Sequence, residues 1–430
     1  MRARYVGALA LVGLFVAAVT AGAGTARVDV STATSITVWL QQDAQQAWPG
    51  VVDAANAAFK AQHPDVEVKV EYQTWTEHLT KLDAAIAGNN APDVVELGNT
   101  EMTKYMAAGA FADLTSVKSQ FANSSTWLKS LADSATYRGR VYGVPYYAGA
   151  RAVIYRKDYF RKAGFKSPPR SLSEFISYGS KLMQTFKKDK KFSAVYFAGQ
   201  YWYAGMSFVY DYGGAIARFR NGQWVGTLDS PQALQGLNKL KQFVLATSRA
   251  SKTTDEAHPW QFTIFPQGHV AAMIANGWEW GLILDPKDGN PKLANTLGGF
   301  PMPSHVKGKY MPTFLGGSDL AVTAASKNRQ LAIDWIKAYT STSAQRELAT
   351  VGKVIPNTTS LASIHSGNPQ LAPFAQAAKA SWFVPTAPRW ADVESARVIQ
   401  NMMTAIFTGR KTVAKAAADA SRQITQILNS

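Results

Sequence analysis

The sequence predicts an α/β protein with two lobes. Three observations support this prediction: the length of 430 residues, the alternation of strand-like and helix-like segments after residue 35, and a composition that is 47% hydrophobic and 17% charged. A chain of this length is about two or three times a typical single domain. The composition is that of a well-packed globular protein, which excludes a disordered or collagen-like chain.

Residues 1–23 have the pattern of a signal peptide. Arg2 and Arg4 precede an apolar run over residues 6–19, and the small residues at 21–23 form an A-x-A-like cleavage site. The run is shorter than the roughly 18 apolar residues that a membrane span needs. We therefore expect cleavage after Ala23 and export across the cytoplasmic membrane, to the cell surface or a periplasm, where roles that need ATP, a nicotinamide or a genome are disfavoured.

The first ordered segments alternate between strands and helices. Residues 36–40 form a compact apolar run typical of a buried strand, and helical spacing then continues until His63-Pro64. Period-two alternation over 66–72 predicts a strand, 77–87 a helix, and 93–97 a third strand. Strands joined by crossover helices predict a mostly parallel sheet, whose ligands bind at the carboxyl ends of the strands.

The later segments predict a second set of elements. An extended run with several aromatic residues covers 142–155, where we expect the first lobe to end. Glycine interrupts the strand-like segments at 298–303 and 314–320. The remaining helices are predicted over 171–186, 231–246, 329–339, 343–350 and 412–428.

The net charge and the cysteine content exclude or disfavour several classes of function. Lys+Arg 45 against Asp+Glu 29 gives a net charge of +16, but no nucleic-acid-binding motif is present and the signal peptide opposes such a role. The absence of cysteine excludes disulfides, a cysteine nucleophile, thiolate metal sites and a thioether-linked lipid. We expect no metal and no cofactor, because the histidines are scattered without ligand spacing: His63, His78, His258, His269, His305 and His365.

Seven short sequence motifs follow one another along the chain, at 38–40, 92–99, 143–158, 265–273, 314–318, 354–357 and Trp390. Together they resemble the extracytoplasmic solute-binding proteins of sugar-importing ABC transporters, in the cluster that contains the maltodextrin-binding proteins. The segments 98–100, 199–203, 277–279 and 315–318 are most similar to the chitobiose-binding proteins of actinobacteria.

The resemblance implies a two-lobed periplasmic-binding-protein fold, with hinge-crossing strands and a ligand cleft between the lobes. Lobe one would be 35–147 plus 300–345, and lobe two 148–299 plus 346–430. It also implies a monomer without catalytic activity that captures a di- or oligosaccharide, chitobiose-type leading, and delivers it to an ABC transporter permease. Gram-positive relatives carry a lipid-modified cysteine after the signal, and this sequence has none there.

Aromatic residues are the candidates for the flat face of a sugar. Trp278 follows a glycine turn, and both Trp278 and Trp390 match stacking positions of the family. Trp202 lies between two tyrosines, and Tyr147 lies at the expected crossing between the lobes. Core packing is the alternative for each tryptophan.

Polar residues are the candidates for hydrogen bonding to the hydroxyl groups around the edge of a sugar ring. They are Gln41 and Asp43 after the first strand, Asn99 and Thr100 after the third, Arg151, Glu279, and the glycine-rich segment Gly317, Ser318 and Asp319. Arg151 matches an arginine of the chitobiose-type relatives. The alternatives are a turn at Asn99, a solvated loop at Gln41 and Asp43, a surface ion pair for Arg151, and hinge packing at 317–319.

Two other functions use similar residues. A glycoside hydrolase needs two carboxylates about 5 to 10 Å apart, and Asp255 with Glu256 or Asp392 with Glu394 offer such pairs, but no hydrolase motif surrounds them. A secreted lectin or adhesin without a transport role would use the same aromatic stacking. Closure of the lobes on the ligand would distinguish a transport receptor from a lectin.

Overall fold

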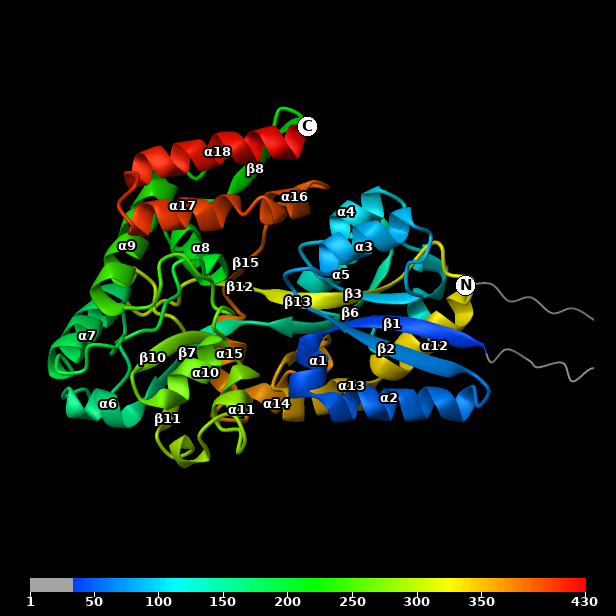
Figure 1. Cartoon of the computed structure of the whole chain (residues 1–430), viewed down its shortest axis with the longest axis horizontal. Helices are drawn as coiled ribbons and strands as arrows, with labels where there is room; N and C mark the ends of the chain where they lie inside the picture. The colour runs from blue at the N-terminus through cyan, green and yellow to red at the C-terminus, as the bar shows by residue number, and fades with distance from the viewer. Residues whose placement is uncertain (1–33) are drawn as a thin grey trace, which may run out of the picture.

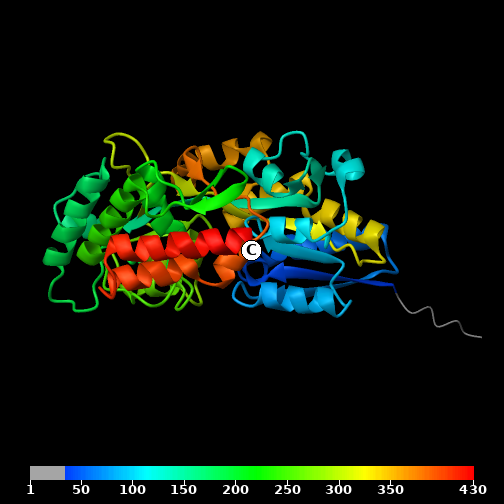
Figure 2. The ribbon, with the colours of Figure 1, turned by 90° about the horizontal axis from the view of Figure 1, so that it is seen from above.

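The computed structural model describes residues 34–430, so the predicted signal peptide at 1–23 lies outside the described residues. The molecule is elongated and has two lobes, as Figures 1 and 2 show from two directions. One lobe is built on a six-stranded sheet and the other on a three-stranded sheet with most of the longer helices around it.

The first lobe contains the six-stranded sheet. Its strand order is β14 (Ile355–Pro356), β6 (Gly143–Gly149), β13 (Gly316–Val322), β3 (Val94–Gly98), β1 (Ser35–Gln41) and β2 (Glu67–Gln73). Strand β1 is parallel to β2 and β3, as the alternating pattern predicts. Strand β13 is antiparallel to both β3 and β6, so the sheet is mixed. Local alternation cannot reveal this insertion, because β13 comes from more than 200 residues downstream of β3.

Helices cover both faces of this sheet (Figure 1). One face carries α1 (Gln42–Ala47), α2 (Pro49–Gln62), α12 (Arg329–Tyr339) and α13 (Thr342–Glu347), and the other carries α3 (His78–Ala87), α4 (Met102–Ala107) and α5 (Lys129–Ser134). Helix α2 buries Val52, Ala55 and Phe59 against the sheet. It ends at Gln62, because Pro64 disfavours helical backbone at the preceding residue, His63, which caps the helix.

Short elements complete the first lobe. They are a 3-10 helix at Thr115–Gln120, the hairpin β4 (Thr136–Tyr137) with β5 (Arg140–Val141), and a π-helical turn at Leu348–Gly352.

The second lobe contains the sheet β10 (Ala272–Asn276), β7 (Arg151–Arg156) and β11 (Leu297–Phe300), in which both outer strands are antiparallel to β7. The N-termini of two predicted helices, α7 (Leu172–Thr185) and α9 (Pro231–Thr247), are capped by Ser171 and Ser230, whose hydroxyls accept backbone N–H groups. Helix α18 (Val413–Asn429) packs on α17 (Val398–Phe407) and on the hairpin β8 (Ala217–Arg220) with β9 (Gln223–Gly226).

The other elements of this part of the chain are short. They are α6 (Lys157–Lys162), α8 (Trp202–Asp211), α10 (Gln261–Ile264), α11 (Glu279–Ile283), α14 (Ser363–Ser366), α15 (Ala372–Ala377), α16 (Trp390–Ser395), β12 (Thr313–Phe314), β15 (Ser381–Trp382), and 3-10 turns at Phe265–Gln267, Pro291–Leu293 and Thr359–Leu361.

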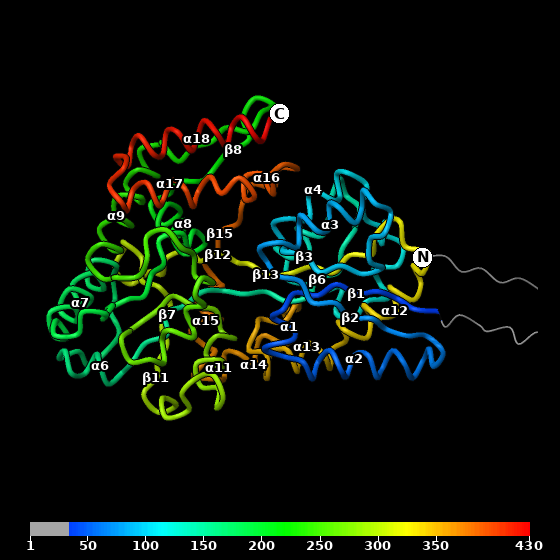
Figure 3. Tube along the Cα trace, viewed as in Figure 1, coloured from blue at the N-terminus to red at the C-terminus, as the bar shows by residue number. Residues whose placement is uncertain are grey.

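The chain crosses between the lobes three times within residues 34–430 (Figure 3). Strand β6 of the first sheet leads into β7 of the second, β12 leads back into β13, and the segment after β14 leads to α15, which contacts β7. The resemblance implies hinge-crossing strands, and the first crossing lies near Tyr147 as expected, whereas the second lies between β12 and β13 and the third is an additional segment after β14.

The predicted lobe boundaries stay a prediction, and the packing favours moving two of them. Phe300, Met311 and Phe314 belong to the core of the second lobe, whereas Leu348 and Val354 belong to the core of the first. On this packing we infer that the chain returns to lobe one at β13 and leaves it after β14.

None of the helices within residues 34–430 combines the length and the hydropathy needed to cross a lipid bilayer.

Candidate ligand-binding site

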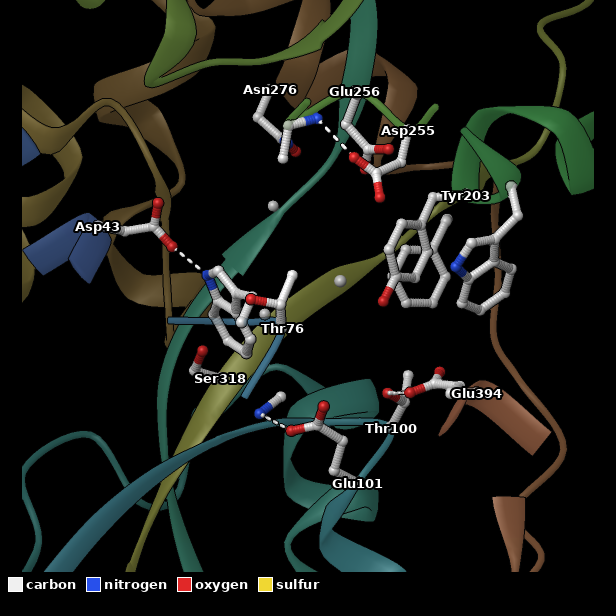
Figure 4. Close-up of a pocket in the computed structure, with 18 of the residues that line it drawn as sticks. Asp43, Thr76, Thr100, Glu101, Tyr203, Asp255, Glu256, Asn276, Ser318 and Glu394 are labelled. Carbon is white, nitrogen blue, oxygen red and sulfur yellow. Dashed lines mark hydrogen bonds between the residues drawn. The ribbon is translucent and has the colours of Figure 1, made fainter. Parts of the chain in front are cut away.

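A cavity of about 450 Å³ lies between the lobes. This volume is within the range of roughly 300 to 1,000 Å³ found for small-molecule sites. The lining includes Asp43 and Asn99 from the sheet edge of the first lobe, and Arg151, Trp202 and Trp278 from the second. Figure 4 shows several of the lining side chains around the open space.

The structure brings ten of the thirteen predicted site residues together in this lining. They are Asp43, Asn99, Thr100, Tyr147, Arg151, Trp202, Trp278, Glu279, Gly317 and Ser318. The other three, Gln41, Asp319 and Trp390, lie behind the lining.

Asp43 is placed by the parallel strands of the first lobe. It stands at the carboxyl end of β1, and Trp75 stands just beyond the carboxyl end of β2, so the two side chains meet at one edge of the sheet. The Nε1 of Trp75 donates a hydrogen bond to Oδ2 of Asp43 at 2.5 Å. Burial raises the pKa of Asp43 to about 6, and the hydrogen bond from Trp75 opposes this rise.

The turn after β3 supplies three more polar residues. The Nδ2 of Asn99 donates to the carbonyl of Leu315 at 3.3 Å, which ties this turn to the segment before β13. Glu101 accepts hydrogen bonds from Nε2 of His78 at 2.8 Å and from the backbone N–H of Gly98 at 2.9 Å. These contacts hold the turn in place at the edge of the sheet.

Thr100 and Glu394 connect the two lobes beside the cavity. The hydroxyl of Thr100 donates to Oε2 of Glu394 at 3.4 Å, and Nε1 of Trp390 donates to Oε1 of Glu394 at 2.7 Å. Burial raises the pKa of Glu394 to about 8, and the charge of Glu101 adds to the rise.

Arg151 stands against an aromatic wall of the second lobe. Its Nε donates to the hydroxyl of Tyr201 at 2.8 Å, and its guanidinium carbon lies 4.7 Å from the ring centre of Tyr203. Tyr203 stacks on Phe314 with ring centres 4.7 Å apart, and its ring centre lies 4.0 Å from that of Trp202. These tilted rings and one cation form an aromatic wall that continues the core of the second lobe to the cavity, and exposed ring surface of this kind suits the apolar face of a sugar.

Trp278 and Glu279 stand on the opposite part of the second lobe. Trp278 makes edge contacts with Trp260 and Phe262, at ring-centre distances of 6.3 and 5.9 Å. Glu279 accepts hydrogen bonds from the backbone N–H of Asn276 and from Nε2 of Gln261, both at 2.8 Å. Burial raises the pKa of Glu279 to about 7. Glu279 thus holds the turn that presents Trp278 in addition to lining the cavity.

The three residues behind the lining are held by protein contacts. Gln41 donates its Nε2 to the carbonyl of Glu96 at 3.2 Å. Asp319 is fully buried and accepts from the hydroxyl of Ser134 at 2.7 Å, and burial raises its pKa to about 7. Trp390 is 1% exposed and belongs to the core of the second lobe. For these three residues the geometry favours core packing over direct contact with a ligand.

Several lining residues were not among the predicted contacts. They include Trp75, Glu101, Gln200, Tyr203, Asp255, Glu256, Trp260, Glu394 and Arg397. Trp75 could have been found, because it follows β2 at the same sheet edge as Asp43 and Asn99. In the sequence, Asp255, Glu256 and Glu394 stand out only as carboxylates that a hydrolase could use. Within the described residues, no group of three or more side chains is arranged to hold a metal ion.

Two α/β lobes joined by crossing strands, with an aromatic and polar cavity between them, define a protein that encloses a small solute. The chain belongs to the family of bacterial extracellular solute-binding proteins, whose family profile matches residues 54–379. This membership confirms the predicted family and does not favour a lectin or adhesin.

The relatives and solved structures agree with this assignment. The chain is 33% identical over 359 residues to the diacetylchitobiose binding protein DasA of Streptomyces coelicolor, covering 83% of this chain and 81% of the relative. It is 26% identical over 302 residues to the lactose-binding protein of Rhizobium radiobacter, with 66% of each chain covered.

Two solved structures share the fold. One is the GacH receptor of Streptomyces glaucescens, with a TM-score of 0.79 and 22% identity over 93% of this chain and 99% of that chain. The other is maltose-bound MalE3 of T. maritima, with a TM-score of 0.78 and 21% identity over 92% of this chain and all of that chain. These likenesses confirm the predicted two-lobed fold.

Proposed function

We propose that this protein captures a di- or oligosaccharide in the cavity between its lobes and delivers it to the permease of an ABC importer. The observation that carries the proposal is the cavity lining, in which aromatic rings and hydrogen-bonding side chains come from both lobes. A chitobiose-type sugar leads, supported by 33% identity to a diacetylchitobiose binding protein.

The mechanism follows from the two-lobed geometry. The aromatic wall of Trp202, Tyr203 and Phe314 and the ring of Trp278 would contact the faces of the sugar. Asp43 and Asn99 would meet its hydroxyls from the first lobe. A ligand that contacts both lobes stabilises the closed arrangement over the open one, because only the closed arrangement forms all of these contacts.

The proposal includes a monomer that acts outside the cytoplasm, at the cell surface or in a periplasm, and that catalyses no reaction. The closed, loaded form would be the one that the permease recognises. Membership of an extracellular binding-protein family supports this placement.

Thermal unfolding with a panel of sugars tests the proposal. The panel contains diacetylchitobiose, cellobiose, maltose and lactose. A sugar that binds only the native state, at 100 times its dissociation constant, adds about 2.7 kcal/mol to the free energy of unfolding and raises Tm. We expect diacetylchitobiose to give the largest rise. No rise with any sugar of the panel would contradict the proposal.

A further inference from the structure

The cavity wall is acidic although the chain carries a net charge of +16. Two guanidinium groups line the cavity, those of Arg151 and Arg397. Six carboxylates line it, from Asp43, Glu101, Asp255, Glu256, Glu279 and Glu394. Figure 4 shows that the labelled carboxylates are distributed around the open space and are not gathered at one point.

Only two of these carboxylates have a cationic or titratable partner at contact distance. Glu101 pairs with His78 at 2.8 Å. Asp255 pairs with His258 at 2.7 Å and with Arg397 at 3.5 Å.

The remaining four carboxylates make no ion pair within 4.0 Å among residues 34–430. They are Asp43, Glu256, Glu279 and Glu394. Arg151 makes no ion pair with any of them within 4.0 Å, since its Nε donates to the Tyr201 hydroxyl and its guanidinium lies over the ring of Tyr203. Its charge nevertheless opposes the rise in the pKa of Glu256 and of Glu279. These four carboxyl groups therefore have no cation in contact among the described residues. Burial raises the pKa of each, to about 6 for Asp43, about 7 for Glu279 and about 8 for Glu256 and Glu394.

Two of the four have oxygen atoms left for a ligand. Asp43 is only 6% exposed and uses Oδ2 for Trp75, and within the described residues its Oδ1 has no hydrogen-bond partner. The side-chain carboxyl of Glu256 is partly exposed and accepts a hydrogen bond only from its own backbone N–H among the described residues, and burial raises its pKa to about 8. Both side chains line the cavity, one from each lobe.

The unpaired carboxyl groups of the cavity indicate the chemistry of a ligand that would bind there. A neutral sugar donates hydrogen bonds through its hydroxyls but brings no positive charge, so enclosing it favours the protonated form of these buried carboxyl groups and leaves Asp43, whose pKa is the lowest of the four, without a compensating cation. A protonated primary amine brings one positive charge and three N–H donors, and its hydrogen bonds to carboxylates are of the strong, charge-assisted kind.

We propose that the cavity selects a saccharide that carries a protonated primary amine, such as an amino-sugar disaccharide without its N-acetyl groups. Glu256 contacts the ammonium from the second lobe, and Asp43 offers the same chemistry from the first. This inference rests on the proposed function, because it assumes that a saccharide occupies the cavity.

Isothermal titration calorimetry at pH 7 with two disaccharides tests the inference. One is diacetylchitobiose, which is neutral, and the other is the same disaccharide with both amines free. We expect the wild-type protein to bind the free-amine form at least tenfold more tightly. Glu256→Gln and Asp43→Asn each remove a carboxyl group that a bound ammonium would hold in its ionised form, while keeping the side-chain shape, and each should lower the ratio of the two association constants by at least fivefold.

Glu67→Gln is the matched control. Glu67 lies on β2, its side chain is 59% exposed, and it is not part of the cavity lining. This variant should leave both association constants unchanged. Circular dichroism checks that each variant is folded, and the two cavity variants give independent measurements if one of them fails to fold.

The outcomes separate this inference from the proposed function. Equal or tighter binding of diacetylchitobiose by the wild-type protein would overturn the inference and leave the proposed function standing. A ratio unchanged in both cavity variants would also overturn it. Absence of binding by both disaccharides and by the other sugars of the panel would overturn the proposed function together with the inference.

Discussion

Replacing Trp278 and Trp390 separately by alanine distinguishes a ligand contact from a core residue. From the sequence, both tryptophans are predicted to stack on the sugar. In the structure Trp278 lines the cavity and is partly exposed, whereas Trp390 is 1% exposed and packs in the core of the second lobe. We therefore expect opposite effects on affinity and stability.

The magnitudes follow from these positions. One face of the Trp278 indole stacked on a sugar removes on the order of 60 to 80 Å² of apolar surface from water, worth about 2 kcal/mol at roughly 25 cal/mol per Å². Trp278→Ala should then weaken binding about 30-fold. Trp390→Ala should lower the free energy of unfolding by about 3 to 5 kcal/mol, as large-to-small changes in cores do. It also removes the hydrogen-bond donor to Oε1 of Glu394.

The assay measures both quantities for each variant. Urea denaturation gives the free energy of unfolding, and calorimetry with the sugar that gives the largest thermal shift gives the affinity. Trp224→Ala is the control, because Trp224 is a partly exposed tryptophan on β9 that does not line the cavity. The reasoning is refuted if Trp278→Ala binds within threefold of the wild-type protein, or if Trp390→Ala loses less than about 1 kcal/mol of stability.

Three other predictions concern the hinge and the buried carboxylate. Ligand should lower the radius of gyration measured by X-ray scattering, and an unchanged radius at saturation would contradict closure. Gly317 has φ +150° and an added Cβ would meet the carbonyl oxygen of Tyr147, so Gly317→Ala should lose several kcal/mol of stability in urea denaturation. Burial raises the pKa of Asp319 from 3.8 to about 7, so the folded state binds more protons than the unfolded chain and stability falls as pH rises through this window. The free energy of unfolding of Asp319→Asn, measured relative to wild type by urea denaturation at each pH, should therefore rise by about 2 to 3 kcal/mol from pH 5 to pH 8. A difference that stays constant over this range would refute the prediction.

The sheet edge of the first lobe was predictable from the sequence. Strands β1 and β3 have apolar runs that end at polar residues, and parallel strands bring those ends to one edge. Asp43 and Asn99 follow from this rule, and Trp75 follows from it equally. The aromatic wall was only partly predictable, since Trp202 and Tyr203 are adjacent in sequence but Phe314 joins them through tertiary packing.

The sequence alone could not show that Asp319 and Trp390 lie behind the cavity lining. Ser318 and Asp319 are neighbours on β13, and side chains of a strand alternate between its faces, so only Ser318 reaches the cavity. The local pattern cannot tell which face is which, because both faces of this strand are buried. Trp390 matches a family pattern, but α16 turns its ring into the core and presents Glu394 to the cavity.

The position of β13 has a consequence for the order in which the protein acquires its structure. In the first sheet β3 and β6 do not pair with each other, because β13 lies between them. During synthesis both strands are made long before residues 316–322, so until then each lacks a neighbour on that side. The first lobe cannot complete its sheet until most of the chain has emerged, whereas the three strands of the second sheet lie within residues 151–300. The first lobe therefore stays incompletely folded until late in synthesis, after all three strands of the second sheet have been made.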